Sequence, residues 1–271
     1  MFYSATTYAD NTEYEVPIGE AEVGQWSFSL LAGYAAIENP LNKHDDIKTY
    51  LLPTWSYYGE RFYIDNTTIG YSIIETDSLL FDFSGYLNEE GALFNLDNAN
   101  LSFLDISNYV PRKDMRPNAP KPVFENIERN FSYMVGAAVQ WPNEYIQARL
   151  VYGKDVTAGH GGEEFTFSLF NYYHLGNFKL NWQLGAVRKS QQLVEYYYQF
   201  RPEEINGFES PYKFKDITNK FVQVAASYQL SKNFDLVLSV KKTWLDEELL
   251  TTPLVAKDSY IKWIAGFNYK F

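Results

Sequence analysis

Apolar and polar side chains alternate along most of this chain, and this period of two constrains its fold more than any other feature. In residues 261–271 every second position is apolar, whereas the positions between are mostly polar or small. Successive side chains of a strand point to opposite faces of a sheet, so the pattern predicts a strand with one apolar face. Similar alternation, of varying regularity, occurs in segments 26–36, 47–58, 61–75, 79–87, 131–141, 145–153, 165–173, 178–187, 221–230 and 234–241. The sequence therefore predicts an all-β protein.

The alternation is compatible with a membrane protein even though the mean hydropathy is only −0.34. No run approaches the roughly 18 apolar residues that a membrane helix needs, but a transmembrane β-barrel turns only every second side chain toward lipid. Outer-membrane barrels combine short periplasmic turns with longer extracellular loops. If the C-terminus lies on the periplasmic side, the short turns of this sequence all fall on that side too. Short polar turns at 142–144, 175–177 and 231–233 alternate with longer segments at 154–163, 190–218 and 245–258.

The number of strands follows from a parity rule. Single-chain bacterial barrels have an even number of strands, and the eleven alternating segments fall one short of twelve. We predict a closed antiparallel transmembrane barrel of about twelve strands, with ten as the alternative. The additional strand lies within residues 101–110, or residues 61–75 form two strands. We predict a loop or a short helix in residues 88–130 and a polar N-terminal leader in residues 1–22. Residues 23–271 are predicted to form a single barrel domain.

Periodicity alone cannot say which face is inside, because a soluble barrel alternates equally well with its apolar face inward. Aromatic residues near the ends of predicted strands, such as Trp26 and Trp141, favour an outward apolar face with girdles at both interfaces. Phe267, Tyr269 and Phe271 share that face and resemble the C-terminal assembly signal of outer-membrane barrels. We therefore predict an integral protein of the bacterial outer membrane. Its expected contacts are outer-membrane lipid, lipopolysaccharide and the barrel-assembly machinery.

Composition excludes several other classes of protein. The chain has no cysteine, which excludes disulfides, thiolate metal sites and cysteine nucleophiles. Its net charge is −11 with no cluster of Lys and Arg, and this argues against nucleic acid as a partner, because phosphates bind to basic patches. Aromatic residues make up 18% of the chain, which is far too many for a disordered protein.

A set of short motifs resembles one known family. The motifs are Leu52-Pro53 followed by the aromatic stretch 57–64, Ile69-Gly70-Tyr71, Tyr196-Tyr197-Tyr198, Thr252-Pro253-Leu254-Val255 and the ending Gly266–Phe271. Together they resemble the MipA/OmpV (MltA-interacting protein) family of Gram-negative outer-membrane proteins, over residues 26–271. The sequence departs from the family pattern at Thr68, where a Gly is usual, and at Gln199-Phe200, where Gly-Val is usual.

This resemblance implies an outer-membrane barrel without catalysis and without a cofactor. The family's founding member is described as a scaffold between a lytic transglycosylase and a peptidoglycan synthase, and other members as porin-like or adhesive. We accordingly expect a structural or scaffolding role, with periplasmic peptidoglycan enzymes as partners. A small porin-like diffusion channel is the alternative, and a lipid-modifying outer-membrane enzyme is the second alternative.

Charged residues on the polar faces of the strands are candidates to line the lumen. Rings of charged side chains set the charge selectivity of narrow pores. The opposing interpretation is that these residues pair with one another and fill the barrel, as side chains do in small barrels. The candidates are Asp82, Arg149, Lys179, Arg188, Asp235, Lys241, Lys262 and Lys270.

The histidines bear on the enzymatic alternative, because hydrolases pair a histidine base with a serine nucleophile. His44 and His160 fall in predicted loops. His174 is six residues from Ser168 on one predicted strand, a separation of about 20 Å. We therefore predict no catalytic residue.

Two further features lie in predicted loops. Acidic runs at 45–46, 89–90, 163–164 and 246–248 are possible ligands for Ca²⁺ or Mg²⁺, but such runs are more often solvated surface, and we predict no metal site. The cluster of Tyr196, Tyr197, Tyr198 and Phe200 is a candidate contact surface for a partner or a glycan. The alternative, which we favour slightly, is that the loop folds over the barrel mouth and buries these rings, or that the rings extend a strand into the interface belt.

Overall fold

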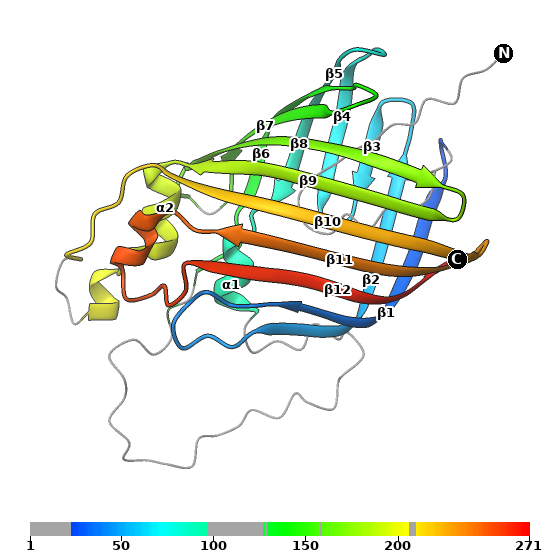
Figure 1. Cartoon of the computed structure of the whole chain (residues 1–271). Helices are drawn as coiled ribbons and strands as arrows, with labels where there is room; N and C mark the ends of the chain where they lie inside the picture. Colours follow the sequence, from blue (N-terminus) through cyan, green and yellow to red (C-terminus); the bar gives the residue numbers. More distant parts are fainter. Residues whose placement is uncertain (1–22, 97–126, 128, 158, 206–209) are drawn as a thin grey trace.

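The computed structural model describes residues 23–96, 127, 129–157, 159–205 and 210–271, and these form a closed antiparallel barrel of twelve strands (Figure 1). Each strand pairs with its neighbour in sequence, and β1 pairs with β12 to close the sheet. The strands are β1 (Trp26–Ile37), β2 (Ile47–Tyr58), β3 (Phe62–Asp65), β4 (Thr68–Glu75), β5 (Leu80–Leu87), β6 (Tyr133–Trp141), β7 (Gln147–Asp155), β8 (Glu163–Leu175), β9 (Phe178–Lys189), β10 (Ile217–Ser231), β11 (Phe234–Trp244) and β12 (Ser259–Lys270).

The predicted twelve-stranded barrel is confirmed, and the uncertain strand is located. Segment 61–75 forms two strands, β3 and β4, joined by a tight turn at Asn66. Asn66 has a φ of 49°, a left-handed conformation that asparagine tolerates better than most residues. The other candidate segment, 101–110, and the predicted leader 1–22 lie outside the described residues.

The two ends of the barrel differ, as the connection lengths predicted. Short connections at 59–61, 76–79, 142–146, 176–177 and 232–233 lie at the end that holds Lys270, which we call the turn end (Figure 1). The opposite end, the loop end, carries the helical segments α1 (Glu90–Asn95), α2 (Gln191–Tyr198), η2 (Pro202–Ile205) and η3 (Glu247–Thr251). The two-residue connection between β3 and β4 is the exception, because it points toward the loop end, part-way along the wall beside Trp55.

The apolar face of the strands points outward. Val224, Leu238 and Phe267 are 48%, 52% and 46% exposed, whereas their inward neighbours Ala225 and Val237 are buried. A soluble barrel would show the opposite arrangement, because water would face the polar side. This outward apolar surface is the arrangement that a hydrocarbon environment favours. No helix in the described part of the chain has the length and hydropathy needed to cross a membrane.

The seam between β1 and β12 depends on two facing glycines. Gly33 lies opposite Gly266 in the register of these strands. A Cβ atom at Gly33 would lie 2.3 Å from the carbonyl oxygen of Ala265 and 2.4 Å from the Cα of Gly266. These neighbours are backbone atoms, which cannot move away as a flexible side chain can. The backbones therefore approach too closely for any side chain at this position.

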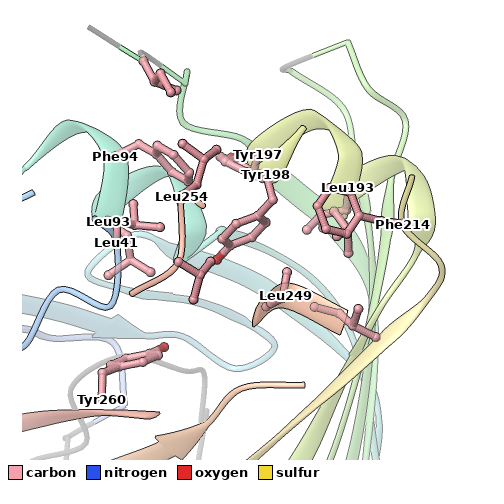
Figure 2. Packing of buried hydrophobic residues seen from close by; sticks show 14 of the residues in the cluster. Leu41, Leu93, Phe94, Leu193, Tyr197, Tyr198, Phe214, Leu249, Leu254 and Tyr260 are labelled. Atoms are coloured by element: carbon pink, nitrogen blue, oxygen red, sulfur yellow. The ribbon is translucent and has the colours of Figure 1, made fainter. Parts of the chain in front are cut away.

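A packed hydrophobic cluster lies at the loop end, and we call it the plug (Figure 2). In α2, the apolar residues Leu193, Val194, Tyr197 and Tyr198 recur at helical spacing and face inward together. All four are at most 1% exposed. The remaining loop residues of the plug are Leu41, Leu93, Phe94, Ile127, Phe200, Phe214, Leu249, Leu254 and Val255. The cluster continues onto inward-facing strand residues such as Met134, so the plug is packed into the barrel mouth.

Candidate functional site in the barrel lumen

Beneath the plug, the lumen contains a polar pocket formed by inward-facing residues of several strands. About 670 Å³ of space between atoms belongs to this pocket, open solvent included, so the enclosed part is much smaller. Amide and hydroxyl groups of Gln183, Gln223 and Thr166 line it beside the Phe221 ring. Charged groups line it as well, namely Glu89, Glu164, Lys189 and Lys241. The pocket is therefore a charged chamber and not an apolar ligand cavity.

The carboxylates of Glu89 and Glu90, where the chain enters α1, bind lysines of the barrel wall. Glu89 accepts from Lys241 at 3.2 Å through Oε1 and from Lys262 at 2.8 Å through Oε2. Glu90 is ion-paired with Lys189 through Oε1 and accepts a hydrogen bond from the Tyr198 hydroxyl through Oε2. Three strands, β9, β11 and β12, thus hold the start of α1 in the lumen.

Electrostatics keeps Glu89 ionised. Burial alone would raise the pKa of Glu89, but the ammonium groups of Lys241 and Lys262 overcome this and hold the pKa well below its usual range. Lys241 and Lys262 are direct partners in the β11–β12 register, so their charges are adjacent. Glu89 is the counter-ion that both lysines share.

Glu89 and Glu90 were expected to be loop surface or a cation site, and that expectation is wrong. Both side chains lie in the lumen, at 20% and 3% exposure, and both bind lysines. Among the described residues, no group of three or more His, Asp or Glu side chains is arranged to hold a metal ion. Glu164 of the 163–164 run is also no loop residue, because it is buried on β8 and accepts hydrogen bonds from the Tyr86 hydroxyl and the Asn88 side-chain amide. Asp246, in contrast, accepts from the backbone N–H of Glu248 at the start of η3.

Most of the predicted lumen residues do point inward. Asp82, Arg149, Asp235 and Lys262 are buried, Lys241 is nearly so, and Lys179 is half-buried opposite the inward Ser227. Some of them pair within the lumen. Lys270 binds Asp235 at 2.6 Å, and the Tyr63 hydroxyl donates to Asp82 at 3.4 Å. A role for these residues in lining a pore stays a prediction.

Arg188 is a correction, because it lies on the outer face. In the register it is opposite the outward-facing Phe165, and its side chain is 65% exposed. It forms an ion pair with Asp216 at 2.8 Å at the loop end. The adjacent Lys189 is the residue that points inward and is 5% exposed. Counting the alternation of β9 in phase from Asn181 would have selected Lys189.

The tyrosine cluster is not an exposed contact surface. Tyr197, Tyr198 and Phe200 are 0%, 1% and 4% exposed, and Tyr196 is half-buried against the His160 ring at 4.6 Å between centroids. Burial over the barrel mouth was the alternative that we favoured. At the other end of the chain, the proposed assembly residues Phe267, Tyr269 and Phe271 all point outward, and their role in assembly stays a prediction.

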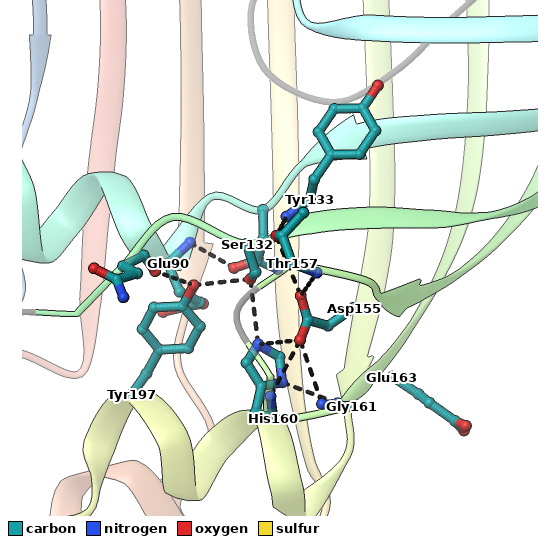
Figure 3. A network of polar contacts seen from close by, with 12 residues as sticks. Glu90, Ser132, Tyr133, Asp155, Thr157, His160, Gly161, Glu163 and Tyr197 are labelled. Atoms are coloured by element: carbon teal, nitrogen blue, oxygen red, sulfur yellow. Dashed lines mark hydrogen bonds and ion pairs between the residues drawn. The ribbon is translucent and has the colours of Figure 1, made fainter.

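A second polar network, around His160, bears on the enzymatic alternative (Figure 3). His160 Nε2 lies 3.3 Å from Ser132 Oγ and 3.5 Å from Asp155 Oδ2, so serine, histidine and aspartate do meet. A catalytic triad, however, uses one imidazole nitrogen for the serine and the other for the aspartate. Here both groups contact Nε2, while Nδ1 accepts a hydrogen bond from the Gly162 N–H at 2.9 Å.

The His160 nitrogen nearest Ser132 carries a proton, so it cannot act as the base for that serine. Because Nδ1 accepts, the proton of the neutral ring resides on Nε2, the nitrogen nearest Ser132. Ser132 Oγ is also bonded to the Tyr197 hydroxyl at 2.9 Å, inside the plug. Burial lowers the pKa of His160, and the Asp155 carboxylate opposes this only partly. The network therefore ties His160 and Asp155 to the plug through Ser132 and Tyr197.

With this geometry in view, comparison with known proteins identifies the family. A model described as MltA-interacting protein MipA matches residues 30–271. The chain belongs to the MipA family. Two relatives from Escherichia coli (strain K12) each cover 90% of the chain and 90% of their own length. YiaT, named as an outer membrane protein, is 21% identical over 254 residues, and the MltA-interacting protein is 22% identical over 245 residues.

Solved structures similar to this MipA-family chain include two outer-membrane proteins. An outer membrane channel from Pseudomonas putida F1 is 10% identical with a TM-score of 0.39, and covers 97% of this chain and 100% of its own. An anion-selective porin from Comamonas acidovorans is 9% identical with a TM-score of 0.36, and covers 91% and 99%. The predicted location in the bacterial outer membrane is confirmed by the name of the relative YiaT and by the closed barrel.

Proposed function

We propose that this chain is a non-enzymatic scaffold of the outer membrane that holds a periplasmic peptidoglycan enzyme near its turn end. The observation that carries the proposal is the plug, a packed cluster in the barrel mouth that ion pairs join to the wall. A protein whose lumen served continuous diffusion would need a water path through that cluster. A closed, firmly anchored barrel suits a structural role better.

The family relatives support the nature of the partner. One E. coli relative is named MltA-interacting protein, and the chain matches it over 90% of its length. The turn end is the side that faces the periplasm in barrels of this kind. Exposed turn-end residues such as Tyr145, at 78% exposure, are therefore the natural contact points.

Site-specific photo-cross-linking can test this proposal. A photoreactive phenylalanine analogue at Tyr145 should cross-link to a lytic transglycosylase when the detergent-solubilised barrel, accessible at both ends, is incubated with a periplasmic extract. The matched control places the same analogue at Glu247, an exposed residue of the loop end. We expect the turn-end site alone to capture the enzyme. Equal capture at both sites, or none at Tyr145, would refute the scaffold proposal.

A planar-bilayer recording separates the proposed scaffold from the channel alternative. The plugged wild-type barrel should show no steady conductance. Steady conductance that charge-reversing changes at Arg149 and Lys179 alter would instead favour a small diffusion channel.

A further inference from the structure

Lys241 and Lys262 form an unusual pair within the lumen. They are direct partners on β11 and β12, and their side chains are only 13% and 7% exposed. Like charges that face each other across two strands destabilise a sheet, and burial from water increases that cost. The pair is therefore stable only with an anion between the two ammonium groups, and the Glu89 carboxylate takes that place.

This counter-ion is not part of the barrel wall. The lumen pair Lys270–Asp235 joins residues of two adjacent strands, which the sheet holds in place. Glu89, in contrast, lies in the connection between β5 and α1, and 152 residues separate it from Lys241. Its neighbour Glu90 has its own partners in Lys189 and Tyr198. Glu89 can therefore leave the two lysines while Glu90 keeps α1 attached to the wall.

The chamber beside the lysine pair offers polar groups to a small polar molecule. The charged chamber described above adjoins Lys241, whose Nζ lies 4.8 Å from the centre of the Phe221 ring. Gln183, Gln223 and Thr166 supply amide and hydroxyl groups to the same chamber. These groups can donate to and accept from a polar ligand, while the ammonium groups bind its charged end.

We propose that Lys241 and Lys262 are a binding site for the carboxylate of a small organic anion, and that Glu89 occupies this site as a tethered substitute. An incoming carboxylate would take over the two ammonium groups as Glu89 swings away, and no covalent bond changes. The inference goes beyond the scaffold proposal and does not depend on it, because it concerns the lumen and not the turn end.

Equilibrium dialysis with radiolabelled acetate tests the site directly. The Glu89→Gln variant, purified in detergent at pH 7, should bind one acetate per chain, and excess chloride at equal ionic strength should not displace it. The double variant Glu89→Gln/Lys262→Met should bind none. Glu163→Gln is the matched control, because Glu163 pairs with the exposed Lys154 on the outer face, and it should leave acetate binding as in the wild type.

The wild type supplies a second measurement that does not depend on the Gln variant folding well. A tethered group competes at an effective concentration in the millimolar range or above, so acetate should bind the wild type at least about tenfold more weakly than Glu89→Gln. Lys262→Met should abolish that weak binding. The proposal is overturned if neither the wild type nor Glu89→Gln binds acetate, or if binding survives the loss of Lys262. The cross-linking result at Tyr145 is unaffected either way.

Discussion

Leu193→Ala probes whether the plug is an independently stable unit. Leu193 is fully buried in the plug, at 0% exposure, and its Cβ lies 2.6 Å from where a Cβ at Gly162 would stand. So tightly packed a site cannot collapse easily around a deletion, and Leu→Ala changes in such cores cost about 3 kcal/mol. Since about 1.4 kcal/mol corresponds to a factor of ten, local opening of the plug should become roughly a hundredfold more frequent.

Amide hydrogen exchange measures that opening segment by segment. The α2 amides, such as Val194 N–H bonded to the Ser190 carbonyl, should exchange about a hundredfold faster in Leu193→Ala, while amides of β8 to β12 should keep their protection. Leu184→Ala is the matched control, since it deletes the same atoms from the outer face of β9. It should leave α2 exchange unchanged. Equal acceleration in the strands, or none in α2, would refute a separately opening plug.

Two further predictions concern the seam and pH. Gly33→Val should destabilise the folded barrel by about 3 kcal/mol or more, because the added Cβ atom would meet the backbone of β12. Urea unfolding in detergent measures this change, with Ala265→Val on the outer face as the control. An unchanged unfolding midpoint for Gly33→Val would contradict the prediction. His160 has a lowered pKa when folded, so below pH about 6.5 the unfolded state binds a proton that the folded state resists. As the pH falls below about 6.5, the unfolding free energy should therefore decrease, by at most about 1.4 kcal/mol per pH unit. His160→Gln should flatten that dependence. Identical pH profiles for the variant and the wild type would remove His160 as the cause.

The strands were predictable because lipid imposes a strict rule on them. Only outward positions meet hydrocarbon, so each strand carries its own pattern independently of the rest of the chain. The same rule explains the ambiguity in segment 61–75, where β3 has only four residues and too few alternations to mark its end. Near the end of β9 the polar pair Arg188-Lys189 hides the phase of the alternation, so the sequence does not show which of the two points inward.

The site was less predictable because its contacts depend on how loops fold. The lysines Lys241 and Lys262 could be placed in the lumen from their strands alone. Their counter-ion could not, since nothing in the sequence connects Glu89 with residues more than 150 positions away. The α2 helix did leave a signal, the i, i+4 spacing of Leu193 with Tyr197 and of Val194 with Tyr198, within a segment whose polar composition predicts a loop.

The barrel wall is uneven in height, and this has a consequence for the surrounding bilayer. β10 has 15 residues, about 50 Å of extended chain, whereas β4 has eight, about 26 Å. In the described structure β2 pairs with the short β3 only through Ser56–Tyr58. Residues 47–53 of β2 therefore pair with β1 but not with β3. Backbone groups left open on that edge are costly in hydrocarbon. We therefore expect headgroups and water to dip toward the low rim formed by β2, β3 and β4, so that the membrane thins on that side and the barrel axis inclines away from the bilayer normal.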